Sequence, residues 1–413
     1  MLKNRDNRSY YLLFFIWPFA MLIYAIRNFR AHWASNIFWL FTIFFGFTYV
    51  IIGHESDASR YKDQLVTMSN SNYNIQQLFS QYLEEGGGEL DIAQRLLTFI
   101  ISKFTEDFRI LFAFFGLFMG YFISRYVWLI INKVERRLDF FAGLILISFS
   151  LVIGIWDMGG IRWNIAATIF VFSVLNYLDK KDRKYLWIAA SAIFVHWSFP
   201  IALAVLLIYF IIGNRTLIYF IIFILSFLIS QINLDIFRDL FANYAPYVVQ
   251  ESRGSYLDQG YADLIADQKG QLNWYVTGHS EGLKWFIFLS VIYLYTKGIK
   301  SMKNNVFVFS IFNFAILFYG IFNILSSIPS VGRFINVGSI LILATSVLYI
   351  GLLKNNFPRW IRLIGIPILM LYIIIRIRIG FDYIGVWTIL GNPLLSIVVE
   401  NDLPLIDIVK GLF

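Results

Sequence analysis

Long apolar runs, rich in phenylalanine, leucine and isoleucine, fill most of this sequence and constrain its fold more than any other feature. Each run approaches the roughly 20 apolar residues that a helix needs to cross a hydrocarbon layer about 30 Å thick. Because lipid offers no hydrogen-bond partner to backbone N–H and C=O groups, spanning segments must be helical. Clear examples are residues 11–26, 37–52, 111–131, 217–230, 306–325 and 340–352. The sequence therefore predicts an all-α polytopic membrane protein with about 12 transmembrane helices.

The composition limits what can lie outside these runs. Of the 413 residues, 59% are hydrophobic and only 15% are charged, so we expect one integral membrane domain over residues 1–413. A net charge of +8 could indicate nucleic acid binding. However, the lysines and arginines lie mainly in short connectors, as expected for cytoplasmic loops of a membrane protein. We therefore expect the chain to contact a lipid bilayer and no nucleic acid.

The distribution of charge along the chain predicts its topology. Two long connectors, 54–107 and 232–281, are acidic and polar and are expected to be outer loops. The chain is also expected to end in an outer segment over residues 377–413. The short basic connectors, which should face the cytoplasm, lie at 27–30, 133–137, 180–184, 215, 297–303 and 354–362.

One stretch requires a broken pair of helices. Between Lys184 and Arg215 lie roughly 30 residues, which would measure about 45 Å as a helix. This length is long for one span and short for two, and the alternating topology requires two. The turn should lie near residues 196–200, because Pro200 ends or kinks a helix. Broken helices in membrane proteins usually line a cavity.

Polar residues that interrupt or end the apolar runs are the candidates for chemistry, because intramembrane charge is costly and persists mainly where it has a use. On the predicted topology they gather near the outer boundary of the membrane. They are Asp57, Arg60 and Tyr61 in the first outer loop, Arg162 at the start of a span, His196 at the helix break, Arg333 in a later outer turn, and Arg376 and Arg378 at the end of the last span.

Each arginine has a plain structural alternative. Arg376 and Arg378 can extend to the interface from an apolar helix, and Arg333 can anchor a short turn there. Arg162 has no carboxylate one helical turn away. Its guanidinium needs a partner, and the oxygens of a phosphate match its planar fork. We expect these arginines, together with Arg60, to bind an anionic substrate.

The other candidates concern proton transfer and local structure. His196 is a possible acid or base at the helix break, although a lone histidine is commonly a satisfied buried residue. Asp57 can act as a base or can cap a local turn. Tyr61 can bind substrate or be an ordinary interfacial aromatic.

Metal and nucleophile chemistry have little support in the sequence. None of the four histidines stands in an HExxH-like spacing, and the carboxylates form no tight ligand cluster. There is no Gly-x-Ser-x-Gly element and no cysteine. We therefore expect no metal and no cofactor.

Four short patterns follow one another in a characteristic order. They are Asp-x-x-x-Tyr at 57–61, Gly-Ile-Arg-Trp-Asn-Ile-Ala at 160–166, Phe-Val-His-Trp-Ser at 194–198 and Gly-Arg-Phe at 332–334. Each is weak alone, but their order and spacing over about residues 50–340 are moderately specific. On these patterns the chain resembles the EpsG-like family of exopolysaccharide polymerases, within the broader Wzy-type group that also makes O-antigen and capsule.

This resemblance implies a glycosyltransferase in the inner (cytoplasmic) membrane whose active site faces outside. It implies a polyprenyl-diphosphate-linked oligosaccharide as substrate, with a flippase and a chain-length regulator as partners. In this reading the arginines stabilise the departing diphosphate. Either His196 or Asp57 takes the proton from the attacking sugar hydroxyl.

Three other classes of protein remain as alternatives. A flippase or transporter would also have many spans, but it should place its charges near the midplane between repeated halves. A membrane O-acyltransferase should keep its active groups within reach of a cytoplasmic acyl donor. A glycan ligase differs mainly in its acceptor.

Overall fold

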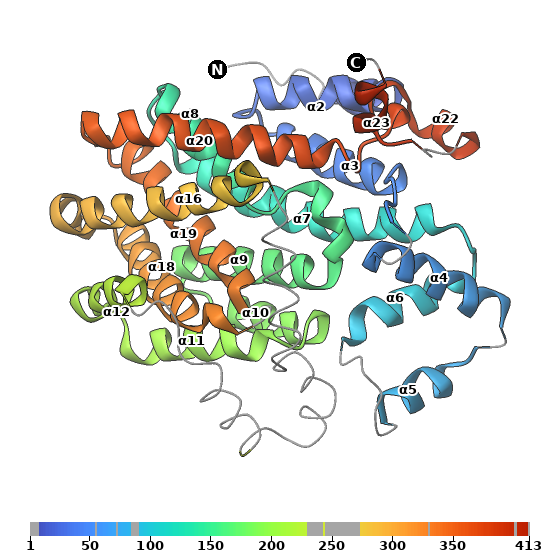
Figure 1. Ribbon diagram of the computed structural model, residues 1–413, viewed down its shortest axis with the longest axis horizontal. Coiled ribbons are helices and arrows are strands. Elements are labelled where there is room, and N and C mark those ends of the chain that lie inside the picture. The colour runs from blue at the N-terminus through green and yellow to red at the C-terminus, as the bar shows by residue number, and fades with distance from the viewer. Residues whose placement is uncertain are drawn as a thin grey trace.

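The chain folds into a bundle of helices. The computed structural model describes residues 8–53, 56–71, 73–83, 91–228, 243, 273–328, 331–399 and 403–411. Within these ranges every regular element is helical, apart from two isolated β-bridges, Tyr49 to Ile384 and Gly385 to Pro404 (Figure 1). The predicted all-α class is confirmed.

The helices have the following bounds. In chain order they are α1 (Arg8–Ile16), α2 (Pro18–Arg27), α3 (Ala34–Phe47), α4 (Asp57–Asn70), α5 (Ile75–Leu83), α6 (Ile92–Ser102), α7 (Phe108–Lys133), α8 (Phe140–Leu151), the 3₁₀ helix η1 (Ile155–Gly160), α9 (Ile161–Lys180), α10 (Lys184–Val195), α11 (Phe199–Ile212), α12 (Thr216–Leu228), α16 (Trp274–Tyr293), the π-helix η3 (Leu294–Gly298), α17 (Ile299–Lys303), α18 (Val306–Ile324), the 3₁₀ helices η4 (Leu325–Ser327) and η5 (Val331–Arg333), α19 (Phe334–Gly351), α20 (Arg359–Gly380), α21 (Val386–Leu390), α22 (Pro393–Val398) and α23 (Leu405–Lys410).

Five helical segments in the described part of the chain are long and apolar enough to cross a membrane. They are Phe108–Lys133, Phe140–Lys180, Val306–Ile324, Val331–Gly351 and Arg359–Gly380. Several shorter apolar helices accompany them. The chain is thus a membrane protein, and the crossing number of about 12 stays a prediction.

The first apolar run shows why an apolar run does not always form one long helix. Residues 11–26 were expected to form one span, but α1 ends at Ile16 and α2 begins at Pro18, with Trp17 between them in a non-helical conformation. Proline has no backbone N–H to donate and its ring clashes with the preceding turn. The run is therefore divided into two helices.

Small residues bring α3 and α7 into close contact. A Cβ added at Gly46 would collide with the backbone of Phe112, and one at Gly116 would collide with the backbone of Thr42. Such close approach of small residues is the usual way for helices to associate in lipid. This packing fixes the end of α3, from which Tyr49 stacks on Phe112 with ring centroids 5.1 Å apart.

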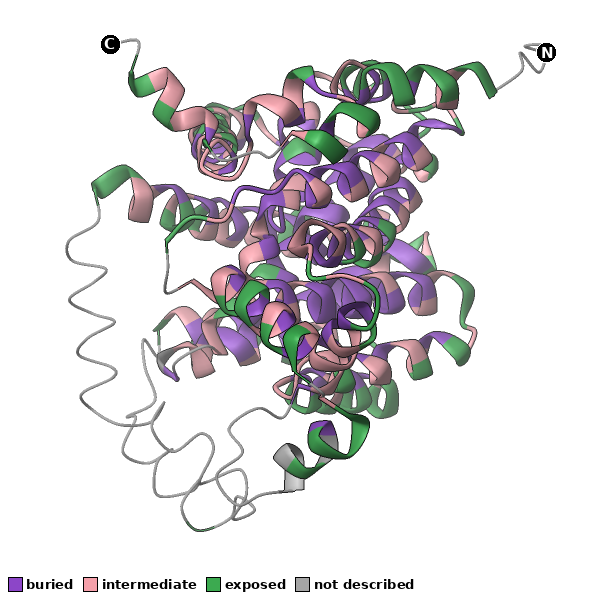
Figure 2. Cartoon of the chain, turned by 90° about the vertical axis from the view of Figure 1, so that its right-hand side faces the viewer, coloured by how far each residue is buried: buried purple, intermediate pink, exposed green. Residues whose placement is uncertain are grey.

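The centre of the bundle is formed by α18 and α19. The apolar stretch of α18 is 83% buried, and that of the segment Val331–Gly351, which contains α19, is 89% buried. The apolar stretch of α20 is only 28% buried. Figure 2 shows this buried centre in purple, surrounded by intermediate and exposed residues. The helix α20 is therefore peripheral, and only one side of it faces the protein.

The basic connectors meet at one end of the bundle. Arg30 donates a 2.8 Å hydrogen bond to the carbonyl of Arg136, whose own side chain donates to Asn356 at 3.2 Å. Lys133 pairs with Asp179 at 2.6 Å. Since α7 ends at Lys133 after 26 residues, its beginning lies about 39 Å away along the helix axis. The first-loop helices α4, α5 and α6 lie at that other end, at the right in Figure 1.

The predicted loops contain helices. The first, 54–107, holds the helices α4, α5 and α6. The second, 232–281, lies outside the described residues except for residue 243 and the stretch from 273 onward, where α16 begins at Trp274. The predicted outer segment 377–413 begins inside α20 and continues through α21, α22 and α23.

The predicted break near residue 196 is present. The helices α10 and α11 have only 12 and 14 residues. Between them His196 is extended, with φ −151° and ψ 120°. Pro200 lies in the first turn of α11, where its missing N–H costs nothing because the first N–H groups of a helix have no partner within the helix. His196 therefore lies at the break, between the end of α10 and the start of α11.

Candidate functional site

Arg162 lies at the centre of a network that joins three parts of the chain. Its Nε donates a 3.0 Å hydrogen bond to the hydroxyl of Tyr61, and its guanidinium carbon is 5.8 Å from the centre of that ring. Its Nη1 is 3.3 Å from Oδ2 of Asp91. The structure thus brings together Tyr61 and Arg162, two of the predicted site residues. The carboxylate that Arg162 lacks on its own helix comes from the first loop.

The sequence of α4 explains why Tyr61 reaches this network. Ala58, Tyr61, Leu65 and Met68 are buried, and their spacing of three and four residues forms one face of a helix. Ser56 caps the helix by accepting the backbone N–H of Ser59 at 3.2 Å. Since the cap is Ser56, the side chain of the next residue, Asp57, is not needed for capping.

Asp91 was not among the predicted residues. It is 1% exposed, and besides Arg162 it contacts the helix break, because its Oδ1 accepts the backbone N–H of Trp197 at 2.9 Å. A buried carboxylate requires such partners. The only signal in the sequence is that an aspartate precedes the apolar helix α6, where it would ordinarily cap the first turn. Its side chain makes no capping bond there.

His196 makes a local contact that fixes its tautomer. Its Nδ1 accepts the backbone N–H of Ser198 at 3.2 Å and lies 2.8 Å from the Ser198 hydroxyl. A ring nitrogen that accepts an amide N–H carries no proton, so the neutral ring holds its proton on Nε2. In this form Nε2 is a hydrogen-bond donor.

Arg333 is placed near Arg162 and the helix break by the contacts of the next residue, Phe334. The ring of Phe334 lies 5.7 Å from that of Trp163 and 5.0 Å from that of Phe199. These residues directly follow Arg333, Arg162 and Ser198, so an aromatic cluster joins three of the motifs. Arg333 itself is exposed at the start of α19. No ion pair of Arg333 occurs among the described residues.

Asp57 lines a cavity of about 310 Å³ between α4, η1, the start of α9 and the end of α20. Asp57 also pairs with Arg60, which is 64% exposed and points to the surface. The polar side chains in the lining are Ser56, Asp57, Asp157, Asn164, Tyr49, Trp156 and Tyr383. This cavity, called the carboxylate cavity below, is next to the Arg162 network because Asp57 and Tyr61 are one turn apart on α4.

The two arginines at the end of α20 have different surroundings. Arg376 forms an ion pair with Asp157 and donates a 2.9 Å hydrogen bond to the carbonyl of Leu151, and it is only 13% exposed. Arg378 pairs with Asp382 at 2.6 Å and is 43% exposed. Arg376 therefore faces the protein, as the partner of a cavity carboxylate, and Arg378 lies at the surface.

The aromatic hydroxyl of Tyr383 remains protonated in this setting. Burial raises the pKa of Tyr383, and the nearby carboxylates of Asp157 and Asp382 raise it further. Its ring stacks on that of Tyr49 with centroids 5.3 Å apart. The cavity thus has a neutral aromatic wall.

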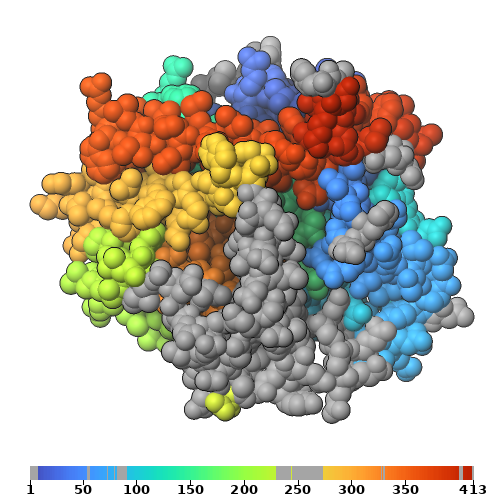
Figure 3. Space-filling view, in the orientation of Figure 1, coloured from blue at the N-terminus to red at the C-terminus, as the bar shows by residue number. Residues whose placement is uncertain are grey.

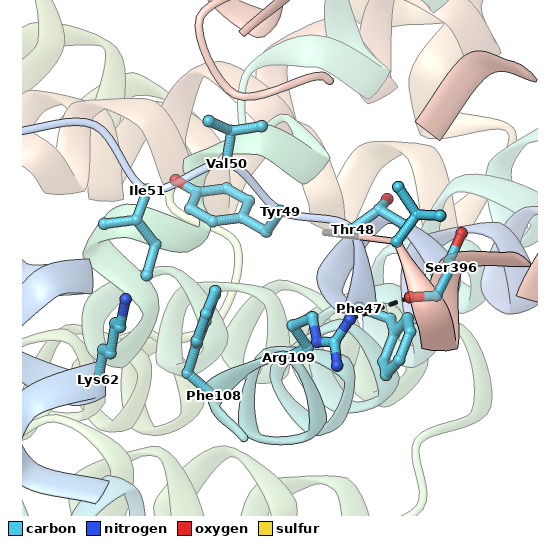
Figure 4. Close-up of a pocket in the computed structure, with 10 residues that line it drawn as sticks. Phe47, Thr48, Tyr49, Val50, Ile51, Lys62, Phe108, Arg109 and Ser396 are labelled. Atoms are coloured by element: carbon cyan, nitrogen blue, oxygen red, sulfur yellow. Dashed lines mark hydrogen bonds between the residues drawn. The ribbon is translucent and has the colours of Figure 1, made fainter. Parts of the chain in front are cut away.

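A second cavity of about 140 Å³ lies on another side of Tyr49 (Figure 4). Arg109 in its lining pairs with Asp107 at 2.7 Å and donates to the carbonyl of Ser396 at 3.1 Å. This contact joins α7 to α22 of the C-terminal segment. In the space-filling view the red C-terminal segment and the blue helices of the first loop lie on the same side of the molecule (Figure 3).

Comparisons with known proteins give one result. The family model of the EpsG family matches residues 37–385, which include every predicted site residue. Comparison with curated proteins and with solved structures found no match. No group of three histidine or carboxylate side chains that could hold a metal ion occurs within the described ranges. Because the matched region covers most of the sequence, this chain belongs to the EpsG family.

Proposed function

We propose that this protein is a membrane glycosyltransferase that polymerises polyprenyl-diphosphate-linked oligosaccharide units at the outer face of the cytoplasmic membrane. The observation that carries the proposal is the position of Arg162, which Tyr61 and Asp91 hold next to the carboxylate cavity. A guanidinium beside acceptor groups suits a reaction between a diphosphate donor and a hydroxyl acceptor. Membership of the EpsG family supports the same reaction.

In the proposed reaction the arginines act on the departing lipid diphosphate. Negative charge develops on its oxygen as the glycosidic bond breaks, and fixed donors aimed at such charge are often the largest contribution to catalysis. Arg162 is held in place by its partners, while Arg333 is exposed and can reach a ligand at the surface. We assign both to the diphosphate, with Arg60 and Arg378 at the rim of the site.

The proton of the attacking hydroxyl must go to a base. Asp57 lines the carboxylate cavity and is ionisable without loss of a helix cap. Nδ1 of His196, the ring nitrogen without a proton in this form, already accepts the Ser198 N–H and is therefore less suited to remove a proton. We therefore favour Asp57 over His196 as the base.

The proposal can be tested in a strain that lacks this gene. Lipid-linked single units should accumulate, and the wild-type gene should restore long polymer. Arg162→Ala and Arg333→Ala at matched expression should both leave single units. Normal long chains from both variants would rule out the assigned role of the arginines.

The same strain separates the proposal from the transport alternative. If the protein polymerises, the accumulated units face outward and an impermeant periodate reagent should oxidise their sugars in intact cells. If the protein is a flippase, the units remain on the cytoplasmic side and are protected. Protection in the deletion strain would contradict the proposed function.

A further inference from the structure

The first turn of α9 separates two chemically different zones. Gly160 and Asn164 line the carboxylate cavity, whereas Arg162 contacts Tyr61 and Asp91. With 3.6 residues per turn, Arg162 points about 160° away from each of the two cavity residues. On α4 the two zones are separated by one turn, about 6 Å along the helix axis. The two zones are therefore neighbours along α4, and each has its own chemistry.

The carboxylate cavity presents more hydrogen-bond acceptors than donors, because the hydroxyls of Tyr49 and Ser56 already donate to the carbonyls of Trp156 and Gly53. Both amide hydrogens of Asn164 are used, because Nδ2 donates to the carbonyls of Asp157 and Gly160 at 2.7 and 3.0 Å. Oδ1 of Asn164 accepts no hydrogen bond from the described residues, so it can accept one from a ligand. Asp57 and Asp157 add two carboxylates, which only accept when ionised. Such a lining matches a ligand that carries many donors.

The charges in this cavity make it unsuitable for a second phosphate group. Asp157 is paired with Arg376, and Asp57 with Arg60. The carboxylates lie in the lining, while neither arginine is among the lining residues. A diphosphate would face like charge here, whereas a neutral sugar would find acceptors for its hydroxyls. The half-buried ring of Tyr383, which is supported from behind by Tyr49, adds apolar area of the kind that packs against a sugar.

We infer that the carboxylate cavity binds the acceptor sugar, one neutral ring of the chain end that supplies the attacking hydroxyl. This inference rests on the proposed function and divides its two substrates between the two zones. The volume of about 310 Å³ is at the low end of the roughly 300–1,000 Å³ of small-molecule sites, which suits a single ring.

In this arrangement one glycosidic bond forms for each bond to the diphosphate that breaks. The acceptor oxygen forms a bond to the anomeric carbon of the donor, and the bond from that carbon to the diphosphate oxygen breaks with its electron pair. The hydroxyl proton passes to Asp57, which lines the cavity. The polyprenyl diphosphate departs on the side of Arg162.

A glycine in the lining allows the cavity to be filled without removing any charged group. A Cβ added at Gly159 would lie 3.4 Å from the Tyr49 hydroxyl, which is an ordinary contact, and Gly159 does not have a positive φ. Its backbone therefore accepts a side chain. Gly143 on α8 offers a matched control, because a Cβ there meets nothing within 4 Å.

The test uses full-length protein in lipid nanodiscs. Polymer formation is measured with lipid-linked units isolated from the deletion strain, and donor-side binding is measured with polyprenyl diphosphate that carries no sugar. Gly159→Leu should reduce polymer formation by about tenfold or more, the effect expected when a pocket is too small for its ligand. It should bind polyprenyl diphosphate as the wild type does, and Gly143→Leu should be normal in both assays. Arg162→Ala should lose both activities.

Gly159→Ala, whose added methyl makes only an ordinary contact, should show a smaller loss in the same direction and guards against a folding defect in the leucine variant. If wild-type protein forms polymer and both Gly159 variants match it, the acceptor assignment is wrong and the proposed function stands. The assignment is also wrong if Gly159→Leu loses polyprenyl diphosphate binding as Arg162→Ala does. If wild-type protein forms no polymer, both proposals fall.

Discussion

Oδ2 of Asp91 lies 3.3 Å from Nη1 of Arg162, and this ion pair links the first loop, residues 54–107, to the start of α9. The same carboxylate accepts the backbone N–H of Trp197 at the helix break. Arg162 is therefore held in a fixed position. In the proposed reaction, a charge that is already in position needs no reorganisation, which is why such groups are effective in catalysis.

The first prediction concerns this carboxylate. Asp91→Asn keeps an oxygen that can accept the Trp197 N–H but removes the charge that pairs with Arg162. Breaking a buried ion pair costs up to about 3–5 kcal/mol, and the loss here should be smaller because Arg162 is 19% exposed. We expect a lower Tm in detergent and reduced polymer. Asp182→Asn, which removes an exposed partner of Lys184, is the control and should leave Tm unchanged. An unchanged Tm in Asp91→Asn would contradict a structural role for the pair.

The second prediction concerns the geometry of Arg162. Lysine keeps the charge but loses the planar fork, so Arg162→Lys should remain badly impaired if the guanidinium binds the diphosphate through two nitrogens. Polymer length on a gel measures the effect. Arg359→Lys, at an exposed arginine of a basic connector, is the matched control. Normal chain length from Arg162→Lys would mean that charge alone is sufficient.

The third prediction separates the two candidates for proton transfer. A general base contributes about 10²- to 10⁴-fold, so Asp57→Asn should lower the rate of polymer formation by that factor in folded protein. His196→Ala should have a smaller effect, because Nδ1 already accepts the Ser198 N–H. A large loss in His196→Ala together with a normal rate in Asp57→Asn would reverse the assignment.

The fourth prediction concerns the side of the membrane on which the site lies. The chain has no cysteine, so single cysteines can be introduced at Asn74, which is exposed near the start of α5, and at Arg183, which is exposed between α9 and α10. An impermeant thiol reagent should label Asn74→Cys in intact cells and Arg183→Cys only after permeabilisation. The opposite pattern would place the candidate site in the cytoplasm.

The positions of helix breaks depend on residues that are close in the sequence, and these could be predicted. The length of the stretch from Lys184 to Arg215 and the position of Pro200 placed the helix break correctly. Apolar run length alone failed at residues 11–26, because Pro18 divides that run. The position of a proline therefore decides where a long apolar run is interrupted.

Pairings between distant residues were beyond local reasoning. Arg162 was expected to pair with a phosphate because its own helix supplies no carboxylate. In the structure it pairs with Asp91, which directly precedes α6. Asp157 and Arg376, 219 residues apart, form a second such pair. Helical periodicity describes one helix at a time, so it indicates which side chains need partners without identifying them.

The most direct test of the central claim is a count of two products in one reaction. Purified protein in liposomes is supplied with lipid-linked units on the outward-facing side, and the new glycosidic bonds and the released polyprenyl diphosphate are both measured. Glycosyl transfer predicts one polyprenyl diphosphate for each bond formed, with both products lost in Arg162→Ala. Movement of intact lipid-linked units across the bilayer, with neither product formed, would contradict the account.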